Sequence, residues 1–591
     1  MFVVATAGHV DHGKSTLAKA LTGMEPDRWA AERERGLTID LGFVWTALPS
    51  GRQVGFVDVP GHQRFLGNML AGLGPAPVVL FIVAADEGWM AQSSDHRDTL
   101  AALGISAGLI VVTRTDRAMP ERVADVIGQA RAELAGTGLA EAPAVAVSAI
   151  TGDGVETLRG ALDELLGGLP APSTDERVRL WVDRSFTIAG AGTVVTGTLA
   201  AGTLVLDQPL EVVGRHGSQS AVVRGLQSHG RDVDRALPVS RVAVNLRGIA
   251  ADEVHRGDAL LTPGAWPQTA VVDVRTGAGE VPEWLTVHIG TAAVPARARA
   301  LDDEHLRLTL AWPVPLQHED TLLLRDPSAG RIVGGATVLD VDPPVLRRRG
   351  DGARRGSALS QRDVGGRVLE EVARRGAVLV EQLAAAGLPV DAAPKGVLEL
   401  GRWWVAEQTL HHWQVQLREA VVQAHHTDPL AAGLSFGAAR DLIALPDAHL
   451  LPEVIAGAGV QSAAGLLFLS ELRADLGPAE AGIVALEKRL AAAPFAAPEA
   501  DDLAHLRLGT RELAAAERAG RLVRLAEGVV LAPKSPALAM RELAALPQPF
   551  TTSQARQALG TSRRVAIPLL EFLDARGWTR RVDGSHREVV R

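Results

Sequence analysis

The sequence lacks cysteine altogether: none occurs in its 591 residues. That absence excludes disulfide bonds, thiolate metal ligands and a cysteine nucleophile, and it suits a reducing compartment. Long hydrophobic runs are also missing, because the longest, at residues 78–85, is far too short to span a bilayer. No basic segment precedes the apolar residues 2–7, which therefore predict a core strand and not a signal peptide. We expect a cytoplasmic protein with no membrane partner.

An excess of basic charge is lacking as well. The 60 lysines and arginines face 69 aspartates and glutamates, which leaves a formal net charge of −9. Any contact with nucleic acid must therefore come from a local patch. The composition, with 47% hydrophobic and 22% charged residues, is ordinary for a globular protein, and the length requires several domains.

What is present begins with a glycine-rich motif at residues 8–15, GHVDHGKS. It fits the phosphate-binding pattern G-x-x-x-x-G-K-[ST], and it lies between a strand pattern and the start of a helix pattern. Gly8 and Gly13 let successive backbone N–H groups face one concavity, and the helix start adds its dipole. By itself the motif also fits a turn that binds nothing. The nucleotide contacts expected from this loop are Asp11, His12, Gly13, Lys14, Ser15 and Thr16.

Two later stretches carry groups suited to a nucleotide switch. Thr38 lies in a polar segment where a hydroxyl can complete a Mg²⁺ shell, and Asp58 lies in a predicted strand at residues 54–59, near its carboxyl end, where a carboxylate can hold a Mg²⁺-bound water. A backbone N–H at Gly61 can approach the γ-phosphate, and His62 is placed to orient the attacking water. The hypothesis therefore assigns Mg²⁺ to Ser15, Thr38 and Asp58, and catalysis to Lys14 and His62.

Strand patterns at residues 78–86, 108–112 and 144–147 alternate with helix patterns. This alternation predicts a doubly wound α/β sheet with ligands at the carboxyl ends of its strands. Asp116 follows one such end, and its carboxylate can accept both the ring N–H and the exocyclic amine of guanine, donors that adenine lacks. The base site expected here consists of Thr113, Arg114, Asp116, Ser148 and Ala149.

Together these motifs resemble the translational GTPases of the elongation factor Tu group, over about the first third of the chain. One motif departs from the common Asn-Lys-x-Asp pattern, since Thr113 replaces Asn and Arg114 replaces Lys. A guanidinium group can stack on a base as the lysine stem does. Threonine at this position resembles the bacterial selenocysteine-specific branch of the group.

From about residue 176 the pattern changes to short β-rich segments, which predict two closed β-barrels at residues 176–264 and 265–345. Asp183, Arg184 and Arg241 resemble the residues that are proposed to form the aminoacyl pocket in the selenocysteine-specific family, SelB. A selenol is an anion at neutral pH, so two guanidinium groups favour it over the hydroxyl of serine. Without that resemblance, surface arginines on a barrel rim are the simpler interpretation.

Residues 353–591 are rich in alanine and leucine, with helix patterns and short hairpins, one expected at residues 403–413. Winged-helix units are predicted, three within 353–535 and a terminal one at 536–591, and the terminal one resembles the RNA-binding unit of SelB. Nine arginines against five acidic residues lie between 541 and 591, and a solvated basic tail is the competing interpretation. The expected RNA contacts are Arg563 and Arg564 on the recognition helix and Arg580 and Arg581 on the wing.

The resemblance implies a multidomain chain: an α/β P-loop GTPase domain at residues 1–170, then the β-barrel domains, then C-terminal winged-helix repeats. It implies GTP/GDP and Mg²⁺ as cofactors, and hydrolysis stimulated by the ribosome. It also implies delivery of selenocysteyl-tRNA at recoded UGA codons by a monomer tethered to an mRNA hairpin. Three alternatives stay open: a general elongation or initiation GTPase, a nucleotide-gated RNA-binding adaptor without useful hydrolysis, and a P-loop ATPase, which Asp116 disfavours.

Overall fold

The computed structural model describes residues 2–26, 41–60, 78–171, 173–360, 364–473 and 476–590. The chain divides into two compact units: residues 1–368 with 380–392, and residues 369–379 with 393–591. The first unit contains the nucleotide motifs and the barrels, and the second contains the greater part of the C-terminal region.

A six-stranded sheet in the order β2-β3-β1-β4-β5-β6 carries the nucleotide motifs. All neighbouring strands run parallel except β2 and β3, and β2 is an edge strand that the sequence patterns did not predict. The strands are β1 (Phe2–Ala7), β2 (Gly42–Ala47), β3 (Gln53–Asp58), β4 (Val78–Ala84), β5 (Ala107–Thr113) and β6 (Ala144–Ala146). The helices are α1 (Lys14–Thr22), α4 (Ala91–Ala102), α5 (Pro120–Leu134) and α6 (Val155–Gly167).

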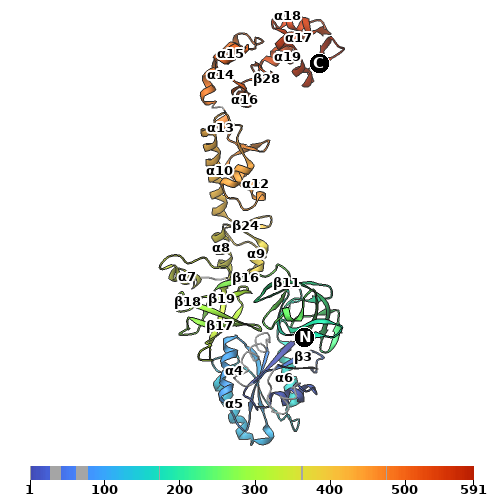
Figure 1. Cartoon of the computed structure of the whole chain (residues 1–591), viewed down its shortest axis with the longest axis vertical. Helices are drawn as coiled ribbons and strands as arrows, with labels where there is room; N and C mark the ends of the chain where they lie inside the picture. The colour runs from blue at the N-terminus through green and yellow to red at the C-terminus, as the bar shows by residue number, and fades with distance from the viewer. Residues whose placement is uncertain are drawn as a thin grey trace. The chain divides into compact units, whose positions relative to one another are not determined.

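Helices cover both faces of this sheet (Figure 1). Alternate residues of β1 separate the two faces: Val3 and Ala5 pack with α4 and α5, whereas Phe2 and Val4 pack with α1 and α6. Because strand side chains alternate between faces, the all-apolar β1 and β4 are explained by burial on both sides. The predicted doubly wound fold is therefore confirmed.

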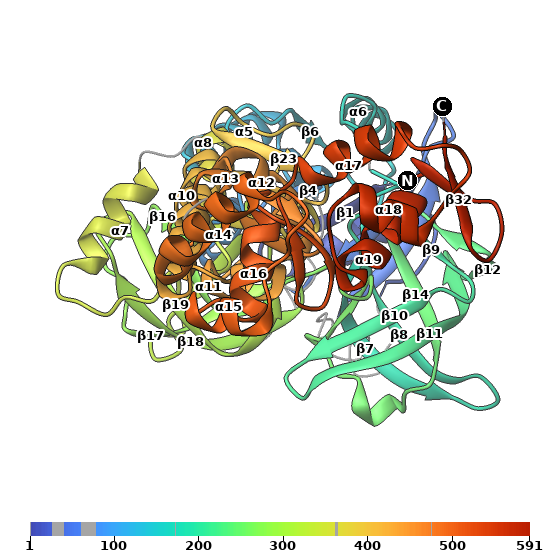
Figure 2. The ribbon, with the colours of Figure 1, turned by 90° about the horizontal axis from the view of Figure 1, so that it is seen from above.

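Two closed barrels follow, as the sequence predicted. In the first, β10 pairs with β11 and closes the ring β10-β15-β7-β8-β14-β11; β7, β8, β10, β11 and β14 lie together in Figure 2. The second closes in the order β16-β19-β18-β17-β20-β21. The strands of the first ring are β7 (Arg179–Ile188), β8 (Gly192–Leu199), β10 (Pro209–Gly214), β11 (Gly217–Ser228), β14 (Ser240–Arg247) and β15 (Ala259–Leu261). Outside the ring, β12 (Arg231–Val233) pairs with β11, and β9 (Leu204–Val205) and β13 (Arg235–Ala236) form a separate two-stranded sheet. The second barrel contains β16 (Gln268–Thr276), β17 (Trp284–Ile289), β18 (Ala292–Ala300), β19 (His305–Pro315), β20 (Thr321–Arg325) and β21 (Ile332–Asp340).

Helices return with α7 (Asp351–Ser360), α8 (Val364–Arg375) and α9 (Val380–Ala385). Four small sheets then recur along the region: β22-β24-β23, β25-β27-β26, β28-β29 and β30-β32-β31. Their strands are β22 (Ala377–Leu379), β23 (Val397–Leu400), β24 (Trp403–Ala406), β25 (Leu434–Ser435), β26 (Gln461–Ala463), β27 (Leu466–Phe468), β28 (Val523–Ala526), β29 (Val529–Leu531), β30 (Phe550–Thr551), β31 (Thr579–Arg581) and β32 (His586–Val589). The helices among them are α10 (Glu407–Thr427), α11 (Phe436–Leu442), α12 (Leu451–Ala458), α13 (Ser470–Arg473), α14 (Glu480–Ala492), α15 (Ala500–His505), α16 (Thr510–Arg518), α17 (Ser535–Ala544), α18 (Thr552–Ala558) and α19 (Arg563–Ala575).

One predicted hairpin was wrong. Residues 403–413 do not fold back on themselves: β24 pairs with β23, and the residues after β24 enter the long helix α10. The turn lies instead at Gly401, whose φ of 64° suits glycine. The apolar residues at 410 and 413 lie three apart, which is a helical spacing that a short β pattern can imitate.

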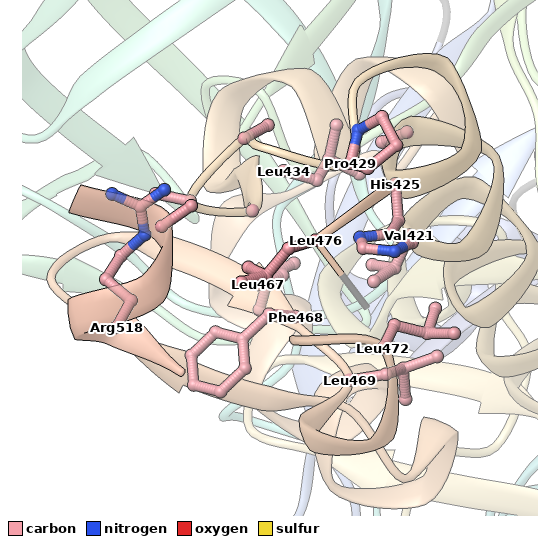
Figure 3. Close-up of a pocket in the computed structure, with 15 residues that line it drawn as sticks. Val421, His425, Pro429, Leu434, Leu467, Phe468, Leu469, Leu472, Leu476 and Arg518 are labelled. Carbon is pink, nitrogen blue, oxygen red and sulfur yellow. The ribbon is translucent and has the colours of Figure 1, made fainter. Parts of the chain in front are cut away.

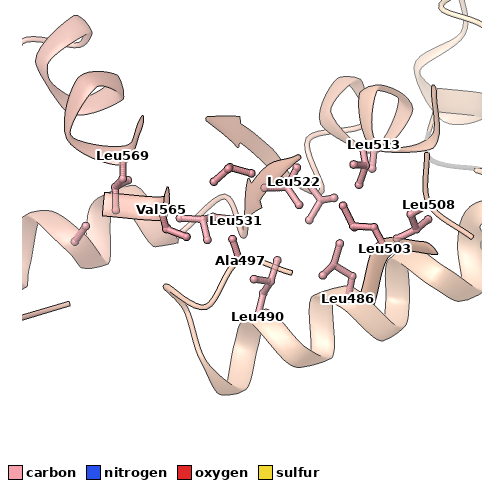
Figure 4. Packing of buried hydrophobic residues seen from close by; sticks show 14 of the residues in the cluster. Leu486, Leu490, Ala497, Leu503, Leu508, Leu513, Leu522, Leu531, Val565 and Leu569 are labelled. Atoms are coloured by element: carbon pink, nitrogen blue, oxygen red, sulfur yellow. The ribbon is translucent and has the colours of Figure 1, made fainter. Parts of the chain in front are cut away.

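The last two predicted winged-helix units share one hydrophobic core. A continuous cluster of buried residues runs from Leu476 in the loop before α14 to Leu573 in α19. Figure 4 shows Leu486 and Leu490 of α14 packed in this cluster together with Val565 and Leu569 of α19. The terminal helices are therefore stabilised by apolar contacts from the preceding segment as well as by their own.

Candidate nucleotide and RNA sites

The P-loop forms the turn that its glycines predict. Gly13 has φ 78° and caps the start of α1, and a β-carbon at Gly8 would collide with the carbonyl oxygen of Ile82. Lys14 is buried, and its Nζ donates to the carbonyl oxygens of Gly8 and His9 at 3.1 and 2.7 Å. Burial lowers the pKa of Lys14 to about 8. The ammonium is thus held beneath the loop, where a phosphate would meet it.

Helix α4 holds the backbone of this loop through two side chains that the sequence reasoning missed. The N–H of Gly8 donates to Nδ1 of His96 at 3.1 Å, and the N–H of Val10 donates to Oε1 of Gln92 at 3.0 Å. Both residues lie one turn apart on α4, and His96 is buried. In the sequence, the two residues are four apart in the helix that follows a central strand, a spacing that puts both on one face of the helix. This spacing is the signal that could have predicted their common contact with the loop.

The side chains predicted to hold Mg²⁺ partly converge. Asp58, fully buried at the end of β3, accepts hydrogen bonds from Ser15 Oγ at 2.6 Å and from Thr6 Oγ1 at 2.7 Å. A hydroxyl and a carboxylate are the hard oxygen donors that Mg²⁺ prefers, so this pair fits the ion. Thr38, Gly61 and His62 lie outside the described residues.

The predicted base site is assembled by the ends of β5 and β6. Ser148 Oγ donates to Asp116 Oδ1 at 2.7 Å, and this hydrogen bond lowers the pKa of Asp116. The carboxylate is therefore held ionised, as acceptance of two N–H donors requires. Ala149 is half-buried beside Ser148.

Thr113 and Arg114, the two residues that differ from the common Asn-Lys-x-Asp motif, form hydrogen bonds to the P-loop. Thr113 Oγ1 is buried and donates to the carbonyl oxygen of His12 at 2.7 Å. Arg114 forms an ion pair with Glu87 at 2.8 Å and donates to the carbonyl oxygen of Asp11. In this conformation Arg114 is occupied by protein partners, and stacking on a base stays a prediction for it.

The remaining P-loop side chains separate into buried and exposed ones. The imidazole of His12 is buried with Nδ1 3.4 Å from the carbonyl oxygen of Ile82, and burial lowers its pKa to about 4. A contact of His12 with nucleotide is therefore expected from its backbone. Asp11 and Thr16 are exposed.

Asp183, Arg184 and Arg241, the residues predicted for the aminoacyl pocket, lie close together where the first barrel faces the nucleotide domain. Arg241 forms a two-pronged ion pair with Asp183, and its guanidinium carbon lies 3.2 Å from the ring centroid of Phe43 on β2. Arg184 Nη2 donates to the carbonyl oxygen of Leu41 at 2.8 Å. Burial raises the pKa of Asp183, but Arg241, Thr196 and Arg184 together outweigh that effect, and the pKa is lowered overall.

Arg184 and Arg241 line a cavity of about 260 Å³ together with Phe43 and Trp45 of β2. Asp183 lies behind Arg241 and is not part of the lining. Among the described residues at the cavity, two guanidinium groups, those of Arg184 and Arg241, outnumber the one carboxylate, that of Asp183, so these residues carry a net positive charge. Such a cavity favours a small anionic group over a neutral one.

The four arginines predicted to bind RNA differ in what they contact. Arg564 donates to the carbonyl oxygens of Gly528, Ala497 and Pro498 at 3.2, 3.3 and 2.7 Å, all in the preceding segment. Arg580 pairs with Glu588 across the wing. Within the described part of the chain, Arg563 and Arg581 are exposed and form no ion pair. Of these four arginines, Arg563 and Arg581 are therefore the ones available to bind a phosphate, while Arg564 connects α19 to the preceding segment.

A small apolar pocket in the second unit lies between α10 and α16 (Figure 3). Leu434, Leu467 and Phe468 line it, and its volume is about 30 Å³. That volume admits about one water molecule, so the pocket cannot hold a nucleotide or a base.

Three family models match separate parts of the chain. Residues 1–167 match the elongation factor Tu GTP-binding domain, and residues 274–345 match the β-barrel domain of the selenocysteine-specific elongation factor. Residues 541–587 match a winged helix of elongation factor SelB. No helix in the described ranges is long and apolar enough to cross a membrane.

Known relatives agree with these matches. The chain is 38% identical over 362 residues to the selenocysteine-specific elongation factor of Desulfomicrobium baculatum, covering 58% of this chain and 57% of that protein. It is 38% identical over 352 residues to that of Escherichia coli (strain K12), covering 59% and 56%. The matched region thus spans little more than half the length of these relatives.

Solved structures extend the likeness to the whole chain. A bacterial selenocysteine-specific elongation factor, EF-Sec, superposes over 100% of both chains with a TM-score of 0.77 and 26% identity. Elongation factor SelB from Methanococcus maripaludis, in complex with the GTP analogue GppNHp, matches 58% of this chain and 79% of that one with a TM-score of 0.51 and 24% identity, which is a likeness of fold alone.

A P-loop on a doubly wound sheet, Asp116 held by Ser148, and two closed barrels define a GTP-binding protein of the elongation factor Tu group. The further barrel and winged-helix matches place it more narrowly. These domains match those of the selenocysteine-specific elongation factors, the SelB family.

Proposed function

We propose that the chain is a GTPase that delivers selenocysteyl-tRNA to the ribosome at recoded UGA codons while its terminal winged helix binds an mRNA hairpin. The observation that carries the proposal is the cavity that Arg184 and Arg241 line together with Phe43 and Trp45 of the nucleotide domain. In this proposal, the cavity provides a site for an anionic amino-acid side chain next to the GTP-binding domain. The basic terminal winged helix binds the mRNA hairpin.

For the nucleotide, Asp116 accepts from the guanine base and the P-loop amides hold the phosphates. Ser15 and Asp58 would hold Mg²⁺, with Thr38 completing the shell, and the ion when bound neutralises charge on the β- and γ-phosphates. Lys14 contributes positive charge at the same phosphates.

His62 orients the attacking water in this proposal. Replacing His62 by alanine should therefore lower ribosome-stimulated hydrolysis by about two or more orders of magnitude while leaving nucleotide affinity unchanged.

For the amino acid, the selenolate lies near Arg184 and Arg241. Serine offers the same shape but a neutral hydroxyl, so its hydrogen bond to a guanidinium lacks the attraction between opposite charges that a selenolate adds. Asp183 holds Arg241 in place, because an arginine that is paired on one edge keeps its orientation.

The decisive experiment measures the affinities of selenocysteyl-tRNA and seryl-tRNA, carried on the same tRNA body, with GTP and with GDP. The proposal expects a strong preference for selenocysteyl-tRNA in the GTP state only. Equal affinity for both tRNAs would instead favour a general elongation GTPase. GTP-dependent RNA binding without stimulated turnover would favour the adaptor.

A further inference from the structure

The outer face of the terminal wing carries a cluster of apolar and cationic side chains. β31 and β32 pair with Arg580 opposite Glu588 and Thr579 opposite Val589. Trp578 and Val582 flank β31, and backbone hydrogen bonds from Val590 to Trp578 and from Val582 to His586 continue the pairing of the strands past both ends of β31. Because side chains alternate along an extended chain, these two residues share a face with Arg580, whereas the buried Thr579 belongs to the face that packs on the helices.

This outer face is exposed. Trp578 is 38% exposed, Val582 52% and Val590 48%, and the backbone N–H of Val590 donates to the carbonyl oxygen of Trp578 at 3.0 Å. Three large apolar side chains on one small sheet face are more than scattered surface exposure explains.

Cations border the same face. The guanidinium carbon of Arg576 lies 4.3 Å from the ring centroid of Phe572 and 5.9 Å from that of Trp578. Arg580 is 73% exposed on the wing and pairs there with Glu588, which lies opposite it on the same face. Indole and guanidinium planes are the two surfaces on which proteins stack unpaired bases, and a nearby arginine can neutralise the flanking phosphate.

We propose that Trp578, with Arg576 and Arg580 beside it, is a stacking site for one unpaired base of an RNA hairpin. The site is separate from Arg563 at the start of α19. The proposal rests on RNA binding by the terminal unit, and it adds the kind of nucleotide that is bound. The positive charge of residues 541–591 in an acidic chain favours RNA over an apolar protein partner.

The test uses the full chain and a hairpin RNA selected on it from a pool with randomised loop nucleotides. Trp578→Ala should weaken binding of this hairpin by about ten- to a hundredfold, the effect of losing one stacked base, and should leave binding of the blunt stem duplex unchanged. Trp578→Phe should restore most of the affinity, because it keeps an aromatic face. Trp578→Leu keeps the apolar packing but no ring, so it should behave like the alanine variant.

A second readout reports stacking directly. 2-Aminopurine placed in turn at each unpaired position should lose fluorescence on binding at one position, and Trp578→Leu should abolish that loss. The matched control is Trp284→Ala, which removes a tryptophan that is 64% exposed on the second barrel and should change neither measurement.

Different results overturn different statements. If no hairpin is selected over duplex, RNA recognition by this chain fails, and the stacking site fails with it. If a hairpin is selected and Arg563→Ala weakens it while all three Trp578 variants bind as the unmodified chain does, the stacking site alone is overturned. Rescue by Trp578→Leu would also overturn it, since packing and not stacking would then explain the alanine variant.

Discussion

The nucleotide site and the terminal winged helix are both built from short motifs, yet they differ in how the side chains reach their positions. At the nucleotide site, Lys14 and Asp116 follow β1 and β5, and Asp58 ends β3; these strands run parallel in one sheet, so the sheet brings the three residues to the same edge. In the terminal unit, Arg563 and Arg564 are adjacent in sequence, but one is exposed and the other bonds to three carbonyl groups of another segment. A motif at the end of a strand therefore predicts where its side chain lies in the fold. Two neighbouring arginines on a helix do not show by sequence alone which of them is exposed and which bonds to the protein.

The largest effect is expected at Asp116, where sequence and structure agree most closely. Asp116→Asn should lower GTP affinity by about three to four orders of magnitude and shift the preference toward xanthine nucleotides, because an amide can donate to the carbonyl that replaces the guanine amine. Equilibrium binding of GTP, XTP and ATP measures this. Equal binding of ATP and GTP by the unmodified chain would contradict the assigned role.

The next largest effect is expected at the cavity lined by Arg184 and Arg241, which is formed by residues of the first barrel and of the nucleotide domain. Arg184→Ala should weaken selenocysteyl-tRNA binding by about thirtyfold and seryl-tRNA binding much less. Arg241→Ala should have a further effect on folding, since it leaves the buried Asp183 without its ion pair. Arg241→Ala combined with Asp183→Asn should recover part of the lost stability. Equal losses for both tRNAs would assign these arginines to the tRNA backbone.

Arg563 and Arg564 test the comparison directly. Arg564→Ala should lower the stability of the terminal helices by about 1–3 kcal/mol, because it removes bonds to buried carbonyl groups, and hydrogen exchange of α17 to α19 in the full chain should increase. Arg563→Ala should leave exchange unchanged and reduce the salt slope of RNA binding by about 1. If the two variants behave alike, the assignment of Arg563 to RNA binding and of Arg564 to the packing of the terminal helices is wrong.

The smallest effect concerns pH. Burial lowers the pKa of Lys14 to about 8 in the nucleotide-free chain, and a bound phosphate raises it again. Nucleotide binding should therefore take up a proton above pH 8, and affinity should fall by at most about tenfold per pH unit there, with no such dependence below pH 7. Calorimetry in two buffers of different ionisation heat measures the proton uptake on binding. If no proton is taken up at pH 8.5, the pKa of Lys14 is not lowered and its ammonium group is more solvated than the structure indicates.

The sequence by itself determined the P-loop, the strand ends and the order of fold types, because these follow from local patterns of period 2 and 3.6 and from residues next to one another in the chain. It did not predict β2, whose pairing with β3 is decided by the sheet, nor the hairpin of β23 and β24.

Only the tertiary structure decided which polar groups meet. Gln92 and His96 bond to the P-loop from more than 80 residues away, and Arg564 bonds to the preceding segment with which α19 shares a core. Such contacts depend on how helices pack on sheets and on each other. The packing is set by the summed burial of many apolar side chains, and no single motif encodes it.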